Sequence, residues 1–344
     1  MSLVKRLPIE TPIITSYPKH AQFLAGLTMN KEIEAWLYSN YIQLYAHSDL
    51  SGENINDFVG GWLDFYTSHQ AYFITPLIRT QRLLRETVGF NRHDCLEFIC
   101  SMIDRGFYVW LFVDKFYISK AWAFQKQTHL HSILLFGYDK SEGIFNAAGF
   151  FDSEGFKTIK VLNSELIQAL FSPKLIESFS VFDYMEYIFM YQFNPKGKFY
   201  FDINCVKDII GDYYLSRNTS EKFYMNRNIL NGSYGLNIYT ALKEFVEYRA
   251  LIKNIDIRPF HVLYDHKKIM VSRINYMEQN EYIKDSLKLY EMYSLIERKA
   301  LTLRNLVIKH NLSKETDYTK KIFLLIDDLA AFELSTLDFM LSKL

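Results

Sequence analysis

Three short segments rich in β-branched and aromatic residues follow one another closely near the middle of the chain. They are residues 107–113 (FYVWLFV), 131–138 (HSILLFGY) and 143–151 (GIFNAAGFF). The turn sequence DKSEG (139–143) separates the last two, a pattern typical of an antiparallel hairpin. We therefore expect a small antiparallel sheet in this part of the chain.

Helical patterns surround these strands. Apolar spacing predicts helices over about 31–46, 78–88 and 93–104, the last with Asn91 or Asp94 as its cap and an end at Gly106. Ser164 is expected to cap a further helix over SELIQALF. Helices together with an antiparallel sheet predict that residues 1–180 form an α+β domain.

The pattern changes after about residue 180. Residues 179–193 (FSVFDYMEYIFMYQF) and 196–203 (KGKFYFDI) are strand-like and aromatic, and the chain turns helical from about 237. One helical stripe comprises Leu289, Tyr293, Ile296, Ala300, Leu303 and Val307, and the last helix, about 318–343, carries Ile322, Leu325, Leu329 and Phe332. Residues 181–344 are thus expected to form a second, mainly helical domain that packs on itself; a homodimer seam is the alternative use of these stripes.

The composition excludes several classes of function. Lys+Arg and Asp+Glu number 39 each, without a basic stripe, so no nucleic-acid partner is expected. Without an 18-residue apolar run or a signal-peptide pattern, the expectation is no membrane contact and a cytoplasmic location. The cysteines Cys95, Cys100 and Cys205 fit no zinc spacing, and neither a metal nor another cofactor is expected.

His131 begins the second predicted strand, and His129 shares its face. Helices followed by a strand that begins with His is the chain order of papain-like cysteine enzymes. In those enzymes a strand histidine activates a thiol that stands at a helix N-terminus. The alternative is a structural histidine whose ring is satisfied at the mouth of a strand.

Several segments resemble one known family. The block 107–118 (FYVWLFVDKFYI) with 129–156 (HLHSILLFGYDKSEGIFNAAGFFDSEGF) resembles the N-terminal domain of the butirosin biosynthesis protein H family. Further similar segments are 17–27 (YPKHAQFLAGL), 36–45 (WLYSNYIQLY), 231–242 (NGSYGLNIYTAL) and 257–277 (IRPFHVLYDHKKIMVSRINYM). The family is related to bacteriocin-processing, papain-like cysteine peptidases. The resemblance implies a papain-like N-terminal domain.

The resemblance also implies a function. An acyltransferase or peptidase-like protein of a nonribosomal peptide or related pathway would act on an amide or on the thioester of an acyl or peptidyl carrier protein. The alternative is a catalytically inactive member that serves as a binding or scaffold partner. That alternative is supported by the helix predicted over 31–46, which contains no cysteine where the family's nucleophile is expected.

Within this family interpretation, His131 is the expected base and Asn146 its expected orienting partner. Ser39 and Cys95 are the candidate nucleophiles. The alternatives are an ordinary polar position on an amphipathic helix for Ser39 and a buried core position for Cys95. Asn40 and Gln43 are candidates for contacting substrate or partner.

A basic cluster lies in the second domain. Arg258, His266, Lys267 and Arg273 are candidates for a surface that docks an acidic carrier protein, with an ordinary solvated helix face as the alternative.

Overall fold

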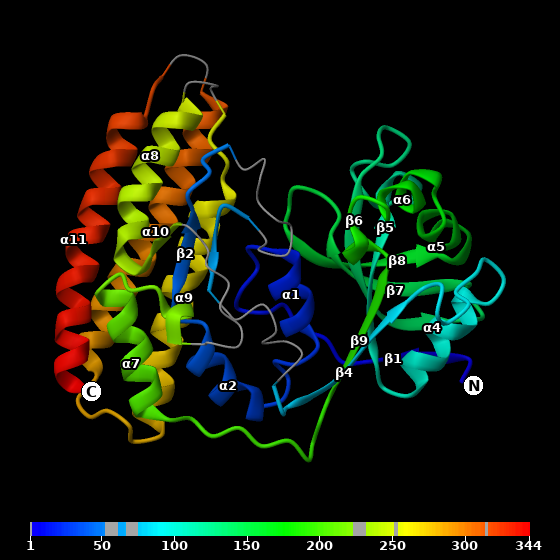
Figure 1. Cartoon of the computed structure of the whole chain (residues 1–344), viewed down its shortest axis with the longest axis horizontal. Helices are drawn as coiled ribbons and strands as arrows, with labels where there is room; N and C mark the ends of the chain where they lie inside the picture. The colour runs from blue at the N-terminus through cyan, green and yellow to red at the C-terminus, as the bar shows by residue number, and fades with distance from the viewer. Residues whose placement is uncertain (1, 52–60, 67–74, 223–231, 251–253, 314–315) are drawn as a thin grey trace. The chain divides into compact units, whose positions relative to one another are not determined.

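The computed structural model describes residues 2–51, 61–66, 75–222, 232–250, 254–313 and 316–344. The chain forms two compact units (Figure 1). Unit 1 comprises Met1–Ile33 and Tyr72–Lys198, and unit 2 comprises Glu34–Ala71 and Phe199–Leu344. The expected boundary at residue 180 is therefore wrong, because strand pairing joins residues 45–47 to residues 232–234 and so places an early segment with the C-terminal helices.

Unit 1 is built on an antiparallel sheet. Its strands are β1 (Val4–Arg6), β4 (Ile78–Leu84), β5 (Tyr108–Asp114), β6 (Leu130–Asp139), β7 (Ile144–Phe150), β8 (Phe156–Leu162) and β9 (Tyr187–Phe193). They follow the order β4-β9-β5-β6-β7-β8, and β1 pairs with β6 beside this path. β6 and β7 form the predicted hairpin, in which Tyr138 stands opposite Phe145. The predicted antiparallel sheet is confirmed.

Short helices pack against this sheet. They are α1 (Pro18–Ala25), α4 (Cys95–Asp104), α5 (Asn163–Leu170) and α6 (Pro173–Ser178), with 3₁₀ turns η2 (Lys115–Tyr117) and η3 (Asp183–Met185). α4 forms where it was predicted, because the Asn91 side chain accepts from the backbone just before the helix and Gly106, at φ +87°, ends it. α1 was not predicted as a helix; it packs against β6 and β7.

Unit 2 combines a small sheet with long helices. Its strands β2 (Leu44–His47), β3 (Leu63–Phe65) and β10 (Gly232–Tyr234) pair antiparallel in the order β10-β2-β3. Its helices are α2 (Glu32–Asn40), α7 (Ile203–Tyr214), α8 (Ile238–Ala250), α9 (Arg258–Gln279), α10 (Leu287–Leu312) and α11 (Thr319–Lys343), with 3₁₀ turns η4 (Thr219–Lys222) and η6 (Gly235–Asn237). α10 packs between α9 and α11, and α11 also contacts α8, as Figure 1 shows.

The predicted stripes locate the core of this bundle. The six residues predicted on α10 are its buried residues. On α11 the buried face is rotated from the prediction: Ile322 and Leu329 are buried, whereas Leu325 and Phe332 are half-buried and Ile326 and Glu333 take their places. The stripes therefore pack within unit 2.

Three local predictions are wrong. Residues 78–84 form a strand rather than a helix, because all seven pair with β9 and tertiary pairing overrides helix propensity. The predicted helix 31–46 ends at Asn40, and residues 44–47 form a strand between β3 and β10. Residues 196–203, predicted as strand-like, form no strand, and α7 begins at Ile203.

A buried ion pair joins the helices of unit 2. The Lys267 Nζ lies 2.7 Å from each carboxylate oxygen of Glu333, and both side chains are fully buried. Tyr239 and Tyr213 donate to the same carboxylate at 2.6 and 3.2 Å. Lys267 also donates to the Tyr213 hydroxyl and to His266 Nδ1, both at 3.0 Å. Because buried charges persist only when they are paired and hydrogen-bonded, this set ties α7, α8, α9 and α11 together.

Breaking this pair should be more harmful than removing it. Lys267→Met should lower the free energy of unfolding by about 3–5 kcal/mol, because the Glu333 carboxylate stays buried without its counter-charge. The double variant Lys267→Met, Glu333→Leu should recover a large part of that loss. Urea denaturation followed by circular dichroism measures both. Lys174→Met, which breaks the surface pair Lys174–Glu177, is the control and should leave the transition unchanged. A double variant less stable than the single one would contradict the interpretation.

Candidate functional site

His131 lies near the start of β6, at one end of the unit 1 sheet. It stands opposite Val113, and its ring stacks on that of His129 with centroids 5.3 Å apart. Burial, reinforced by the charge of Lys115, lowers the pKa of His131 to about 3, so its ring is neutral at pH 7. Nδ1 lies 3.1 Å from the Ser132 carbonyl and therefore carries the donated proton, which leaves Nε2 as the acceptor.

This tautomer is the one that a base requires, but the basicity is low. A general base works best when its pKa lies near the working pH, and that of His131 lies well below it. Among the described residues, the hydrogen bond of the His131 ring goes to the Ser132 carbonyl, and no thiol or hydroxyl takes part. The geometry thus holds His131 as a neutral, structurally anchored ring.

Lys115 shares this end of the sheet and was not predicted. It follows β5 directly, and its side chain is fully buried. Its Nζ donates to the Phe150 carbonyl and lies 5.2 Å from the centroid of the Phe151 ring. Burial lowers the pKa of Lys115 to about 7, and no carboxylate among the described residues offsets that effect. A lysine directly after a buried strand was the available sequence signal.

The neighbouring Asp114 carboxylate accepts hydrogen bonds from two backbone N–H groups and a serine hydroxyl, and it does not pair with Lys115. Its Oδ1 accepts from the backbone N–H groups of Phe116 and His129, each at 3.1 Å. Its Oδ2 accepts from the Ser172 hydroxyl at 3.0 Å. These three donors hold the end of β5, the start of β6 and the N-terminus of α6 around one carboxylate.

A second polar centre, Gln22 on α1, was also missed. The Gln22 Oε1 accepts from Trp110 Nε1 at 2.6 Å and from Ser132 Oγ at 2.7 Å. Its Nε2 donates to the carbonyls of Ser132 at 3.0 Å and Ala148 at 3.4 Å, so the amide bridges β6 and β7. Gly149 makes room for this bridge, because a Cβ there would lie 3.1 Å from Nε2.

Gln22 anchors α1 to the sheet and does not contact the His131 imidazole. Side chains alternate along a strand, so Ser132 points toward Gln22 and His131 points to the other face. Both hydrogens and the carbonyl of the Gln22 amide already have partners. A polar residue within the apolar run AQFLAGL was the only hint of this role in the sequence.

The remaining unit 1 candidates do not assemble around His131. Asn146 stands opposite Gly137, six residues along β6 from His131, which corresponds to roughly 20 Å at the usual rise of a strand. Asn146 therefore cannot orient the imidazole. Cys95 begins α4 but is fully buried, and burial raises its pKa to about 11, so its thiol stays protonated near neutral pH.

The candidates from the predicted first helix lie in unit 2. Ser39 Oγ donates to the Ala35 carbonyl at 2.8 Å, and Asn40 Nδ2 donates to the Trp36 carbonyl at 2.7 Å. Both bonds run back to the preceding turn of α2, a common use of polar side chains within a helix. α1 packs on β6 and β7 of the His131 sheet, and its sequence PKHAQFLA contains no serine, threonine or cysteine.

Gln43 follows α2 and is buried inside unit 2. Its Nε2 donates to the Arg217 carbonyl at 3.1 Å and to Thr219 Oγ1 at 2.8 Å. These contacts link the segment between α2 and β2 to the segment that follows α7. Gln43 is thus a packing residue rather than one exposed to a partner.

The predicted basic docking surface is wrong for most of its members. His266, Lys267 and Arg273 are fully buried on α9, so the solvated-face alternative is wrong for them too. His266 donates from Nε2 to the Ile42 carbonyl at 2.7 Å, and burial holds its pKa well below the ordinary value. Arg258 is exposed, and its guanidinium pairs with Asp256 at 2.6 Å. Helical spacing could not reveal that these cations have buried partners on distant segments.

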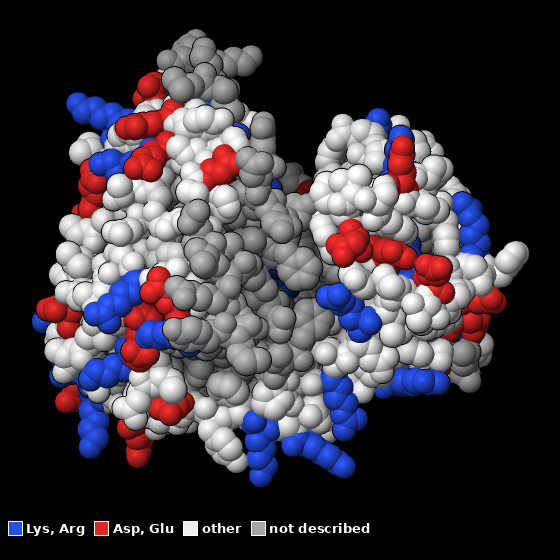
Figure 2. All heavy atoms as spheres, viewed as in Figure 1, with Lys and Arg blue, Asp and Glu red and all other residues white. Residues whose placement is uncertain are grey.

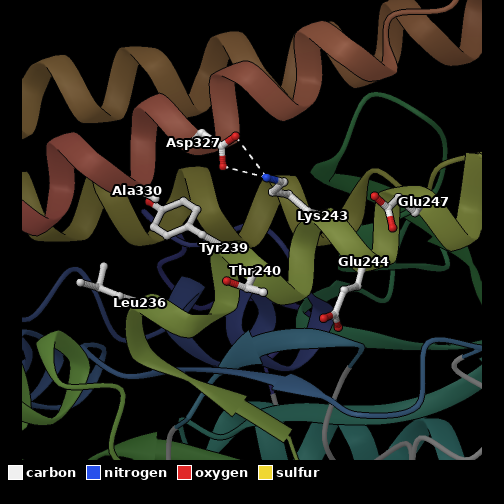
Figure 3. A pocket seen from close by; sticks show the side chains of 8 residues that line it. All are labelled: Leu236, Tyr239, Thr240, Lys243, Glu244, Glu247, Asp327 and Ala330. Atoms are coloured by element: carbon white, nitrogen blue, oxygen red, sulfur yellow. Dashed lines mark hydrogen bonds and ion pairs between the residues drawn. The ribbon is translucent and has the colours of Figure 1, made fainter.

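A shallow pocket opens between α8 and α11 (Figure 3). It is lined by Leu236, Tyr239, Thr240, Lys243, Glu244, Glu247, Asp327 and Ala330. Lys243 reaches across to both oxygens of Asp327, at 3.0 and 3.1 Å, and the Tyr239 hydroxyl is committed to Glu333. The Lys243, Asp327 and Tyr239 groups of this pocket are therefore already paired within the protein.

Neither the charges on the face shown in Figure 2 nor the metal-ligating side chains of the described residues indicate a second candidate site. Acidic and basic side chains both occur on the face shown in Figure 2. The described residues contain no group of three or more His, Cys, Asp or Glu placed to hold a metal. Within the same residues, no helix combines the length and apolar character needed to cross a membrane.

Comparison of the sequence with protein-family models gave no match, and comparison with curated proteins gave none either.

The cysteines should differ sharply in reactivity. In the folded protein at pH 7.5, iodoacetamide should label Cys205, which is exposed, and leave the buried Cys95 and Cys100 unlabelled. Peptide mass spectrometry measures the labelling, and all three should react in 6 M guanidinium. Labelling of Cys95 as fast as a model thiol would contradict its protonated, buried state.

Lys115 should make stability depend on pH. The unfolded chain keeps a proton on Lys115 up to about 10.5, whereas the folded chain loses it near 7. Between these values the lysine lets stability rise with pH, by about 1.4 kcal/mol per unit. Lys115→Met should therefore be more stable than wild type at pH 7.5, and the difference should shrink toward pH 9.5. Urea denaturation at both pH values tests this; a difference that stays constant would contradict it.

Proposed function

We propose that this chain is a catalytically inactive protein of papain-like architecture, related to the butirosin biosynthesis protein H family, that acts by binding. Its partner would be an acyl or peptidyl carrier protein, or the thioester that such a carrier presents. The sequence resemblance supports the family and the class of partner. The observation that carries the inactivity is the His131 ring, which hydrogen-bonds a carbonyl and has no thiol or hydroxyl partner among the described residues.

The state of the candidate nucleophiles supports the same proposal. α1, which packs on the His131 sheet, contributes no nucleophilic side chain. The Cys95 thiol is buried with a raised pKa, and Ser39 is bonded to the backbone of its own helix. A serine without a base, or a thiol held protonated, attacks a carbonyl too slowly to support acyl transfer.

An acyltransferase is the second candidate function. It is favoured by one observation, the Ser132 carbonyl that keeps the proton on Nδ1 of His131 and leaves Nε2 as an acceptor. Catalysis would then need a nucleophile to reach Nε2 in the complex with substrate, since catalytic hydrogen bonds can form only when substrate binds.

An aminoacyl thioester of N-acetylcysteamine separates the two functions. We expect the protein to consume it no faster than buffer does, intact-mass spectra to show no acyl adduct, and His131→Ala to behave like wild type. Calorimetry should show that an aminoacylated carrier protein binds both to the wild-type protein and to His131→Ala. Lys126→Ala, at an exposed position, is the matched control.

An acyl adduct that disappears in His131→Ala would overturn the proposal in favour of the acyltransferase. Absence of both turnover and carrier binding would overturn it as well, because the binding role would then have no ligand.

A further inference from the structure

The segment between β5 and β6, residues 115–128, closes over the end of the unit 1 sheet. At its start, the backbone N–H of Lys115 donates to the His129 carbonyl at 3.0 Å. At its middle, the backbone N–H of Trp122 donates to the Phe151 carbonyl at 2.8 Å, and the Trp122 ring lies 5.1 Å from that of His129. Ile118, within the segment, is fully buried. Further bonds run from the Phe116 N–H to Asp114 and from the Ser119 N–H to Glu165, so basic and acidic neighbours both hold the segment.

Three basic side chains lie at this end of the sheet, one from the segment itself and two from the residues that follow it. Lys115 is fully buried, the rings of His129 and His131 are stacked, and the charge of Lys115 acts on both rings. In this arrangement the ammonium has a carbonyl as its hydrogen-bond acceptor and an aromatic ring nearby. Such surroundings accept an uncharged amine and penalise a charged one.

The acidic groups around the cluster are committed elsewhere. Asp114 on β5 is held by three donors, and Asp152 after β7 pairs with Lys157 of β8. Glu165 on α5 accepts from the backbone of Ser119 at 3.4 Å. At the N-terminus of α6, the Ser172 hydroxyl donates to the Asp114 carboxylate. The other charged residues of the segment, Lys120 and Lys126, are exposed cations. Of these carboxylates, the Asp114 charge favours protonated His129, yet burial and the charge of Lys115 outweigh it and lower the pKa of that ring.

We propose that Lys115, His129 and His131 form an acid-sensitive latch: while uncharged they hold residues 115–128 closed on the sheet, and as they take up protons the segment opens. Opening exposes the three side chains to water, where each is charged at a higher pH than in the closed state. The latch is independent of the proposed binding function, since it rests on the cluster alone.

The direction of the effect follows from proton linkage. The pKa of Lys115 falls from 10.5 to about 7 on closing, so lowering the pH from 10.5 to 7 favours opening through this residue. The pKa of His131 falls from 6.5 to about 3, and that of His129 is also lowered, so a further drop below pH 6.5 favours opening through the histidines. Each group shifts the opening equilibrium up to about tenfold per pH unit within its window.

Hydrogen exchange measured by mass spectrometry on the full chain tests the latch. Protection of peptides covering 115–128, corrected for intrinsic exchange rates, should fall at least about tenfold from pH 9 to 7 and again from pH 6.5 to 5. Peptides from β9 should change little and serve as the internal reference. A wild-type profile that is flat over both ranges overturns the proposal without any variant.

Variants assign the two ranges to their residues. Lys115→Met should abolish the fall between pH 9 and 7, and the double variant His129→Phe, His131→Phe should abolish the fall below pH 6.5. Lys126→Met, an exposed lysine of the same segment, should keep the wild-type profile. Retention of the upper fall in Lys115→Met, with β9 still protected, overturns the role of Lys115. If β9 loses protection in that variant, Lys115→Leu replaces it under the same criterion.

Discussion

Both units bury a lysine, and the way each lysine is accommodated shapes the structure around it. In unit 2, Lys267 donates to the Glu333 carboxylate, to the Tyr213 hydroxyl and to His266. Tyr239 donates to the same carboxylate. In unit 1, Lys115 has a carbonyl and an aromatic ring but no carboxylate partner among the described residues. A buried charge must be paired or neutralised, so the first lysine joins four helices and the second leaves one end of a sheet sensitive to protons.

The same physical cause explains the character of the candidate site. Burial and the nearby Lys115 hold His131 neutral, and burial holds the Cys95 thiol protonated. Desolvation thus weakens both groups that acyl transfer would need, a base and a thiolate. This is why the proposed function is binding by an inactive protein rather than catalysis, and why the chemically distinctive residue at this end of the sheet is Lys115.

Local patterns predicted the parts of the fold that depend on neighbours in sequence. The hairpin of β6 and β7 and the six buried residues of α10 agree with the structure, because a turn signal and a helical stripe are complete within one segment. Residues 78–84 were mispredicted, since their strand exists only through pairing with β9, about 110 residues later. The assignment of residues 34–71 to unit 2 has the same origin in the pairing of β2 with β10.

The sequence by itself determined the mixed α and β composition of the chain, its antiparallel hairpin and the buried face of α10. Only the tertiary structure decided what the polar residues do. His266 and Lys267 are on a helix that could equally have been solvated, and Gln22 and Lys115 could have been surface residues. Their roles depend on carboxylates, carbonyls and rings supplied by distant segments. Burial and partner identity are properties of the folded chain, and they set the charge state and reactivity of each group.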